Sequence, residues 1–367
     1  MTISVCNPVL NGNEKKYVNE CLDDNWISSN GKFITRFENE FSEYCGCKYG
    51  IACSSGTSAL HLALLALKIK PGDEVIVPTF TMIATTNAIQ YVGATPVYID
   101  AELKTWNMDI SQIERKITKQ TKAIIVVHTY GCPVDMDKIN KIAKKHKLYV
   151  IEDAAEAHGA NYKDAKVGSL SDIACFSFYG NKIITTGEGG MVVTNSKLYK
   201  DRCAYYKNHC FDEPRFIHRN IGYNYRMTNI QAAIGVAQLE QIDKLVDAKV
   251  LNASIYNDLL RDEEGITIPP EVVYADNVYW MYGILIDEKK FGKSKEELMK
   301  FLAKNGIQTR SFFYPAHKQP AYKHEKQDLP ISEQLYEQGL YLPSACDLTE
   351  ENIQYICNEI KRFKIWK

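Results

Sequence analysis

The sequence predicts an α/β protein with a large, mainly parallel-sheet domain followed by a smaller C-terminal α+β domain. Three observations support this prediction. Strand-like and helical segments alternate from Tyr49 to Ile151, as in βαβ units around a parallel sheet. The chain has 367 residues, more than the roughly 250 to 300 at which a single core stops growing. After Ile221 the alternation gives way to a long helical region and then to short, mixed elements.

The predicted large domain spans residues 1–245, and its N-terminal helices contribute to the ligand cleft. Its helices have apolar residues at helical spacing, and its strands are short apolar runs bounded by turn residues. We predict helices at 14–22, 33–44, 59–67, 81–91 and 136–146, and strands at 49–53, 73–78, 95–99, 123–128, 148–151, 173–178 and 191–194. Ligands of such sheets bind at the carboxyl ends of the strands, so the loops that follow them are the first place to look for chemistry.

The predicted small domain spans residues 246–367. Thr228 and Gln231 have the spacing of a capping box, and they begin a helical region that runs to about residue 259 and leads into this domain. Beyond it we predict strands at 266–268, 278–286 and 308–314 and helices at 294–303 and 350–363.

The composition excludes several classes of protein. Hydrophobic residues make up 45% and charged residues 24%, which are ordinary globular values, and the formal net charge of -1 gives no electrostatic footprint for nucleic acid or a membrane surface. Residues 1–12 lack the pattern of a secretory signal and no apolar run reaches membrane-span length, so we expect a cytoplasmic protein. The 11 cysteines suit reduced core thiols, and no metal site is predicted.

Lys182 follows the strand predicted at 173–178 and a Gly180-Asn181 turn, and a glycine-rich segment at 187–190 comes after it. A single lysine in a loop is most simply a solvated surface charge. The alternative is a Schiff-base lysine, whose amine must lie near an aldehyde and be partly desolvated. Pyridoxal phosphate (PLP) chemistry would also require a phosphate site and an acid for the pyridine nitrogen.

The turn at residues 54–58 is a candidate phosphate site. It links a predicted strand to an apolar helix, so that backbone N–H groups and the positive end of the helix dipole point at one place. Serine and threonine are also favoured as simple helix caps, and this alternative stays open.

Asp153 and Glu156 follow the strand predicted at 148–151, at the edge where ligands bind. A carboxylate at this place could also only cap the next helix. We choose Asp153 as the partner of the pyridine nitrogen, where its negative charge would keep the ring protonated and able to accept electrons.

Five segments together resemble the DegT/DnrJ/EryC1/StrS family of nucleotide-sugar aminotransferases. They are residues 55–57 (Ser-Gly-Thr), 152–156 (Glu-Asp-Ala-Ala-Glu), 177–182 (Ser-Phe-Tyr-Gly-Asn-Lys), 187–190 (Gly-Glu-Gly-Gly) and 222–227 (Gly-Tyr-Asn-Tyr-Arg-Met). The likeness runs from about Asn7 to the C-terminal helix. It implies a fold type I PLP enzyme of aspartate aminotransferase-like architecture.

The resemblance also implies roles for particular residues. Lys182 would bind PLP as a Schiff base and move protons during catalysis, and Asp153 would pair with the pyridine nitrogen. The other implied cofactor contacts are Gly56, Thr57 and Ser177 at the phosphate, Glu156 beside the ring hydroxyl, and Asn224 from a neighbouring subunit, which makes a homodimer with shared sites. Met82 stands where many relatives have an aromatic residue that stacks on the ring, and its sulfur can also lie against an aromatic face.

Within the family, residues 26–31, 178–182 and 185–190 most resemble the enzymes that aminate C4 of GDP-4-dehydro-6-deoxy-D-mannose with L-glutamate as donor. The product, GDP-perosamine, would serve lipopolysaccharide O-antigen synthesis. The candidate contacts to the sugar nucleotide are Trp26, Ser29, Arg310, Tyr314 and His317. A dTDP- or UDP-linked 4-keto-6-deoxy sugar is the main alternative substrate.

Two other functions are possible on the same fold. Sugar 3-dehydratases resemble these enzymes but carry histidine at the lysine position, so the presence of Lys182 favours transamination. A non-catalytic regulator need not retain a complete set of chemically matched groups, and the intact set here argues against it.

Overall fold

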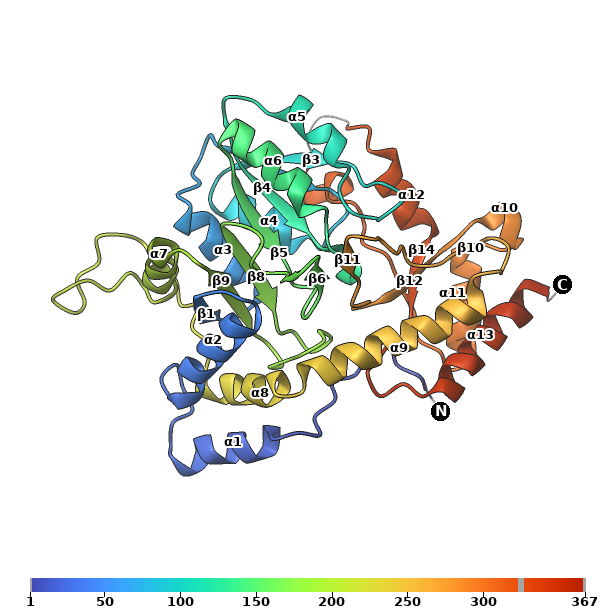
Figure 1. The fold of residues 1–367 in the computed structure, drawn as a ribbon, viewed down its shortest axis with the longest axis horizontal. Coiled ribbons are helices and arrows are strands. Elements are labelled where there is room, and N and C mark those ends of the chain that lie inside the picture. Colours follow the sequence, from blue (N-terminus) through green and yellow to red (C-terminus); the bar gives the residue numbers. More distant parts are fainter. Residues whose placement is uncertain (1, 323–326, 366–367) are drawn as a thin grey trace.

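The computed structural model describes residues 2–322 and 327–365. Its centre is a seven-stranded sheet in the order β1-β9-β8-β5-β4-β2-β3 (Figure 1). β9 runs antiparallel to both of its neighbours, and the remaining pairs are parallel. The strands are β1 (Tyr49–Cys53), β2 (Glu74–Pro78), β3 (Thr95–Ile99), β4 (Thr121–Val127), β5 (Tyr149–Asp153), β8 (Ile173–Ser177) and β9 (Gly190–Thr194). The prediction of a mainly parallel sheet is confirmed.

Helices cover both faces of this sheet because successive strand residues point to opposite sides. In β8, Ile173 and Cys175 pack in the core beneath α3, α4 and α7, whereas Ala174 and Phe176 pack in the core beneath α2 and α8. The helices of this part are α1 (Glu14–Asp23), α2 (Lys32–Tyr44), α3 (Gly56–Ala66), α4 (Ala84–Tyr91), α5 (Ile113–Lys116), α6 (Met136–His146), α7 (Lys197–Lys207) and α8 (Asn229–Leu239).

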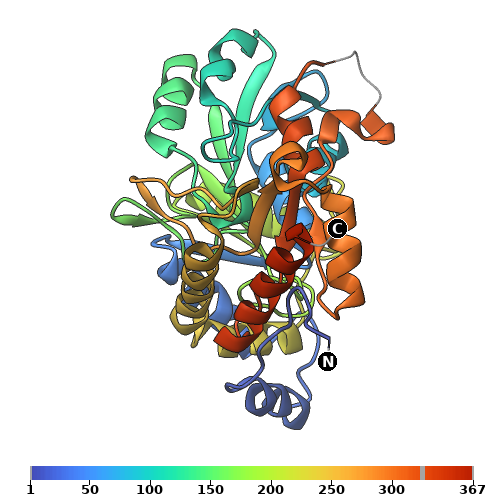
Figure 2. The ribbon, with the colours of Figure 1, turned by 90° about the vertical axis from the view of Figure 1, so that its right-hand side faces the viewer.

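The C-terminal part is built on a four-stranded antiparallel sheet in the order β10-β12-β14-β13. Helices α9, α11 and α13 share one hydrophobic core with this sheet, and Figure 2 views the molecule from their side. The elements are α9 (Ile242–Leu260), β10 (Ile266–Thr267), β12 (Tyr282–Ile286), α10 (Glu288–Phe291), α11 (Lys295–Lys304), β13 (Arg310–Ser311), α12 (Pro330–Gln338), β14 (Gly339–Leu342) and α13 (Glu350–Ile365). A third, small sheet joins β11 (Ala275–Asp276) to β6 (Asn161–Tyr162) and β7 (Ala165–Lys166).

Five predicted elements need correction. The single helical region at 230–259 is two helices, α8 and α9, because Gln241 between them has non-helical backbone angles (φ -118°, ψ 5°). The strand at 308–314 is only the two residues of β13, and the strand at 278–286 begins at Tyr282. The helices at 59–67 and 81–91 begin at Gly56 and Ala84. The capping box of Thr228 and Gln231 is confirmed.

The predicted domain boundary at residue 245 lies inside α9, the helix that joins the two parts in Figure 1. The division at this residue stays a prediction. Among the described residues, no helix combines the length and the apolar character that crossing a membrane requires.

Candidate active site

The N-terminus of α3 meets the ends of β8 and β9 at very short range. A Cβ atom on Gly56 would lie 2.7 Å from Cβ of Ser177, and one on Gly190 would lie 2.2 Å from the carbonyl oxygen of Ser55. Both distances are shorter than real Cβ contacts, so these two positions need glycine. The first turn of α3 is therefore held directly against the carboxyl end of β8.

The N-terminus of α3 has the features of an anion-binding site. The side chain of Ser55 caps the helix by accepting from the N–H of Ser58 at 3.1 Å, and Ser58 Oγ accepts in return from the N–H of Ser55 at 2.9 Å. The N–H groups of Gly56 and Thr57, the first two of the helix, cannot have partners inside it. They point out at the positive end of the helix dipole, beside the hydroxyl of Ser177.

Asp153 is the last residue of β5, not a loop residue as its predicted place beyond the strand suggested. Its side chain is buried, and it accepts hydrogen bonds from the hydroxyl of Thr85 at 2.7 Å and the N–H of Ala155 at 3.3 Å. Burial raises the pKa of Asp153, while the bond from Thr85 opposes this shift. An ionised Asp153 therefore gains from a nearby positive charge.

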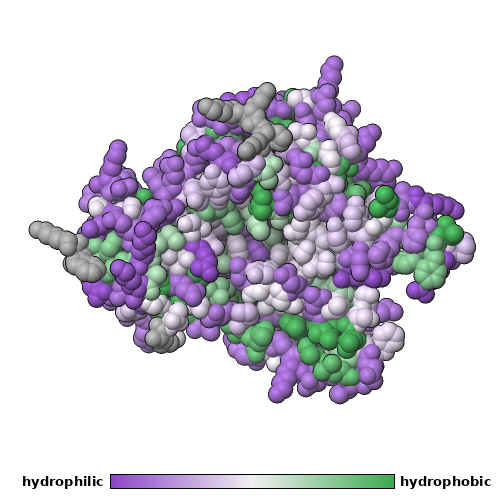
Figure 3. All heavy atoms as spheres, turned by 180° about the vertical axis from the view of Figure 1, so that it is seen from behind, coloured by the Kyte–Doolittle hydropathy of each residue, from purple (hydrophilic) through white to green (hydrophobic). Residues whose placement is uncertain are grey.

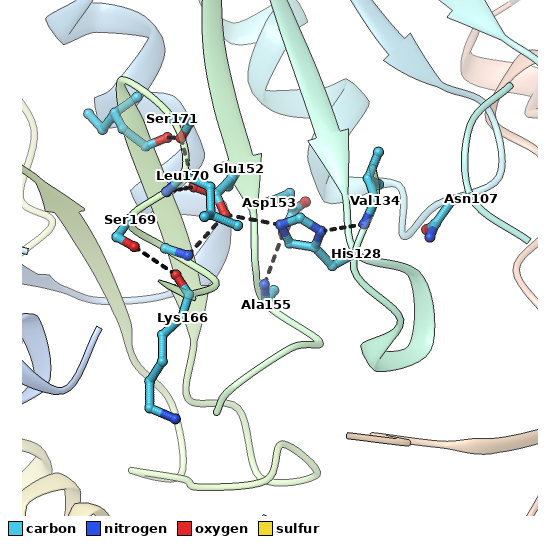
Figure 4. A network of polar contacts seen from close by, with 12 residues as sticks. Asn107, His128, Val134, Glu152, Asp153, Ala155, Lys166, Ser169, Leu170 and Ser171 are labelled. Carbon is cyan, nitrogen blue, oxygen red and sulfur yellow. Dashed lines mark hydrogen bonds and ion pairs between the residues drawn. The ribbon is translucent and has the colours of Figure 1, made fainter. Parts of the chain in front are cut away.

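The neighbouring Glu152 has a different environment, although it is also buried (Figure 4). Its oxygens accept from His128 Nε2 at 3.1 Å and from Gly168, Leu170 and Ser171 at 2.9 to 3.0 Å. His128 carries its proton on Nε2, because Nδ1 accepts from the N–H of Val134. Since Glu152 is fully engaged in tying loops to the sheet, only Asp153 of the two carboxyls is a candidate for ligand chemistry.

Glu156 is buried beside Asp153 and accepts from the backbone N–H of Tyr130 at 2.7 Å. Burial raises the pKa of Glu156 to about 7, although the charge of Lys182 acts in the opposite direction. A carboxyl in this state can hold or release a proton near neutral pH.

Lys182 lies in the loop after β8, where its backbone N–H donates to the carbonyl of Tyr179 at 2.9 Å. Its Nζ lies 3.6 Å from the centre of the Trp280 ring. Desolvation lowers the pKa of Lys182, and the carboxylates of Glu156 and Asp153 oppose that shift. The structure thus brings a lysine amine, two carboxyl groups and an anion-binding helix terminus to one site.

Two further predicted cofactor contacts lie around this centre. Met82 is 50% exposed, and its carbonyl accepts from the N–H of Thr85, the residue that contacts Asp153. Asn224 is exposed on the segment between α7 and α8. Its Oδ1 accepts from Nε of Arg226 at 3.0 Å, so its amide N–H groups point away from Arg226.

The predicted substrate contacts are more widely spread. Arg310 lines a hollow of about 280 Å³ with Asn181, next to Lys182. Trp26 lines a separate hollow of about 560 Å³, and Ser29 lines another of about 600 Å³ that also contains Arg226.

Tyr314 and His317 make contacts within their own chain. Tyr314 is 40% exposed and packs edge-on against Tyr336, with ring centres 4.9 Å apart. The His317 side chain is 4% exposed, with Nδ1 2.7 Å from Thr79 Oγ1 and Nε2 3.2 Å from Glu333. Both ring nitrogens of His317 are thus engaged, which leaves Tyr314 as the more accessible of the two.

Sequence reasoning missed Thr85, Tyr130 and Trp280, which contact Asp153, Glu156 and Lys182 respectively. Thr85 belongs to a helical pattern and Trp280 to a strand-like one, so periodicity assigns both to packing. Tyr130 has a left-handed backbone (φ 53°), which is uncommon for a bulky residue but has no signal in the sequence.

Residues 8–361 match the sequence model of the DegT/DnrJ/EryC1/StrS aminotransferase family. The chain belongs to this family. It is 50% identical to the GDP-perosamine synthase of Escherichia coli O157:H7 over 98% of both chains, and 45% identical to that of Vibrio cholerae over 98% of this chain and 99% of the other. The PLP-form of Spr1654, a putative sugar aminotransferase from Streptococcus pneumoniae, superposes with a TM-score of 0.93 at 27% identity over 99% of both chains.

Membership of the DegT/DnrJ/EryC1/StrS family confirms two predictions from the sequence. The aminotransferase class is correct, and so is the fold type I architecture, since the solved aminotransferases of this family superpose over nearly the whole chain.

Proposed function

We propose that this protein is a PLP-dependent aminotransferase that moves the amino group of L-glutamate to C4 of GDP-4-dehydro-6-deoxy-D-mannose and produces GDP-perosamine. The observation that carries the proposal is the meeting of Lys182, Asp153 and the α3 terminus at one site. Relatives named GDP-perosamine synthase at 45% and 50% identity support the choice of substrate. The product would supply O-antigen synthesis.

The groups at the site fit PLP. The N–H groups of Gly56 and Thr57 and the hydroxyl of Ser177 suit its phosphate, in a space that a Cβ on Gly56 would fill. The carboxylate of Asp153 suits a protonated pyridine nitrogen, and the Lys182 amine suits the aldehyde. Met82 and Glu156 would complete the site beside the ring. When bound, PLP supplies an electron sink that stabilises negative charge on the reacting carbon.

Lys182 and Asp153 have different roles in the proposed reaction. Nζ of Lys182 takes a proton from the carbon that carries nitrogen in glutamate, and it returns a proton to C4 of the sugar in the second half of the cycle. Burial lowers the pKa of Lys182, which favours the neutral, basic form of its amine. Asp153 holds its negative charge where the ring nitrogen needs it. Glutamate leaves as 2-oxoglutarate before the sugar binds, which gives ping-pong kinetics.

The experiment that tests this function offers two sugars in parallel. The protein, PLP and L-glutamate are incubated with GDP-4-dehydro-6-deoxymannose or with dTDP-4-dehydro-6-deoxyglucose, and the amino sugar is followed by mass. We expect a preference for the GDP sugar. A preference for the dTDP sugar would refute the substrate and retain the chemistry. The third outcome is a protein that gives no amino sugar and shows no absorption band of a PLP Schiff base after PLP is added. This outcome would favour a non-catalytic regulator over an aminotransferase.

We further propose that the protein acts as a homodimer with shared sites. Figure 3 shows hydrophobic side chains gathered over the N-terminal segment that carries α1 and at the tip of the segment between α7 and α8. In the first region Leu22 is 53% and Trp26 53% exposed, and in the second Phe216 is 70% and Ile221 85% exposed. Such exposed apolar groups favour contact with another chain. Asn224 lies on the same segment as Phe216 and would reach the partner's site.

Mixing two inactive variants tests this sharing. If Asn224 serves the partner's site, a heterodimer of Lys182→Ala and Asn224→Ala chains contains one intact site. The isolated mixed dimer should then have about half the activity of the wild-type dimer, because one of its two sites is intact. Co-expression with two different tags provides the mixed dimer, and each homodimer is the control. A mixed dimer no more active than the two homodimers would show that Asn224 serves its own chain.

Cytoplasmic location is part of the proposal. All 11 cysteines are free thiols in the structure, which suits a reducing compartment.

A further inference from the structure

Trp280 contacts the proposed cofactor lysine in two ways. Its ring face lies against Nζ of Lys182, 3.6 Å from the ring centre, and its indole N–H donates to the carbonyl of Asn181 at 2.7 Å. Asn181 is the residue immediately before Lys182. Trp280 itself is 4% exposed, so this contact lies out of bulk water, where an ion beside an aromatic face is most strongly stabilised.

The backbone of Trp280 is fixed from α9. Lys249 on this helix is 1% exposed, and its ammonium donates to the carbonyl of Trp280 at 3.0 Å and to the carbonyl of Ser344. The ring of Tyr130 stacks with that of Trp280, with ring centres 6.2 Å apart and an interplanar angle of 29°. Tyr130 also binds Glu156 through its backbone N–H. None of these contacts of Lys249 is with a carboxylate, and burying a cation without one costs free energy. We therefore attribute the burial of Lys249 to its contact with the backbone of Trp280.

We propose that Trp280 is a positioning residue, whose ring face receives the Lys182 amine whenever that amine is free and stabilises its protonated form. The inference rests on the proposed function, because Lys182 is released from the cofactor only when an amino substrate takes its place. Without this contact, the free side chain of Lys182 would sample many rotamers, and its amine would return to the reacting carbon more slowly. Lys249 acts through Trp280 by holding its backbone.

The ring differs from the other groups that face Lys182. Asp153 and Glu156 from the end of β5 and Cys6 from the N-terminal segment favour the protonated amine, but all three can titrate, and His158 is kept neutral by burial, which lowers its pKa to about 3. Trp280 supplies attraction for a cation at every pH. Desolvation lowers the pKa of Lys182, and the ring of Trp280 opposes that effect. Without the ring, the amine should therefore lose its proton at lower pH.

The test measures the Lys182 amine in the cofactor-free protein. Trace acetylation between pH 6 and 11, followed by mass spectrometry of the peptide with Lys182, gives its titration curve. In Trp280→Leu the midpoint should fall by roughly 0.5 to 1.5 pH units, the range expected for loss of a cation–π contact. Trp280→Phe keeps a weaker ring face and should shift the midpoint less. Trp106→Leu, which removes another buried indole, should leave it unchanged.

The outcomes are distinct. Equal shifts in Trp280→Leu and Trp280→Phe would mean that the bond to Asn181, and not the ring face, holds the amine, and this would overturn the proposal. An unchanged midpoint in both variants would overturn it as well. The pH profile of kcat in the PLP-loaded variants should move with the same sign. A wild-type protein without PLP absorption would refute the proposed function instead, whatever the titration of Lys182 shows.

Discussion

Replacing Lys182 by alanine should lower turnover by at least about 10⁴-fold, because no other amine at the site can move the proton. Lys182→Arg should be equally inactive, since its guanidinium stays protonated and cannot act as a base. Both variants should still bind PLP through the α3 terminus and Asp153. Turnover is measured by following the amino sugar by mass with PLP, L-glutamate and the GDP sugar, and PLP retention by absorbance after gel filtration.

Lys48→Ala is the matched control, because Lys48 is an exposed lysine on the surface of the same domain. Its turnover should equal that of the wild type. A Lys182 variant with undiminished turnover would refute the assignment of the lysine and, with it, the mechanism.

The large sheet could be predicted because its strands are buried on both faces. Such strands read as continuous apolar runs, and all seven have both ends within two residues of the prediction. The prediction failed where contacts between distant segments determine the secondary structure. Two residues between α8 and α9 break an apolar helical pattern that continues through them, and β14 and α12 depend on partners from far along the chain.

The reactive core of the site could also be predicted, because each group follows a strand or begins a helix. Lys182, Asp153 and Gly56 are marked by turns and capping residues within a few positions of themselves. Thr85, Tyr130 and Trp280 support these groups from other segments, and no local pattern connects them. Trp280 is 98 positions from Lys182 in the sequence, and only the packing of α9 and β12 brings it there.

Replacing Asp153 by asparagine should lower turnover by about 10² to 10³-fold, the usual effect of losing one preorganised electrostatic partner. The asparagine fits the same space but cannot keep the ring nitrogen protonated. Glu152→Gln is a sharp control because the two residues are adjacent. Glutamine cannot accept all of the hydrogen bonds that Glu152 receives, so this variant should lose about 1 to 3 kcal/mol of stability and retain most of its turnover per folded molecule.

Asp153→Asn should have the opposite effect on stability. Burial raises the pKa of Asp153 above its ordinary value of 3.8, so the folded protein binds more protons than the unfolded chain between that value and the raised one. The free energy of unfolding therefore falls as pH rises through this window and stays low above it. Asparagine does not titrate. Its Nδ2 can donate to Thr85, whose hydroxyl can turn to the Met82 carbonyl 3.1 Å away.

At pH 8 the free energy of unfolding of the cofactor-free Asp153→Asn variant should thus be about 1 kcal/mol higher than that of the wild type. The difference should shrink toward acid pH. Urea unfolding of both proteins at several pH values measures this directly. A variant less stable than the wild type at pH 8 would show that the carboxylate stabilises the empty site. The expected result, lower activity with higher stability, would mean that Asp153 is kept for its charge on the cofactor and at a cost to the fold.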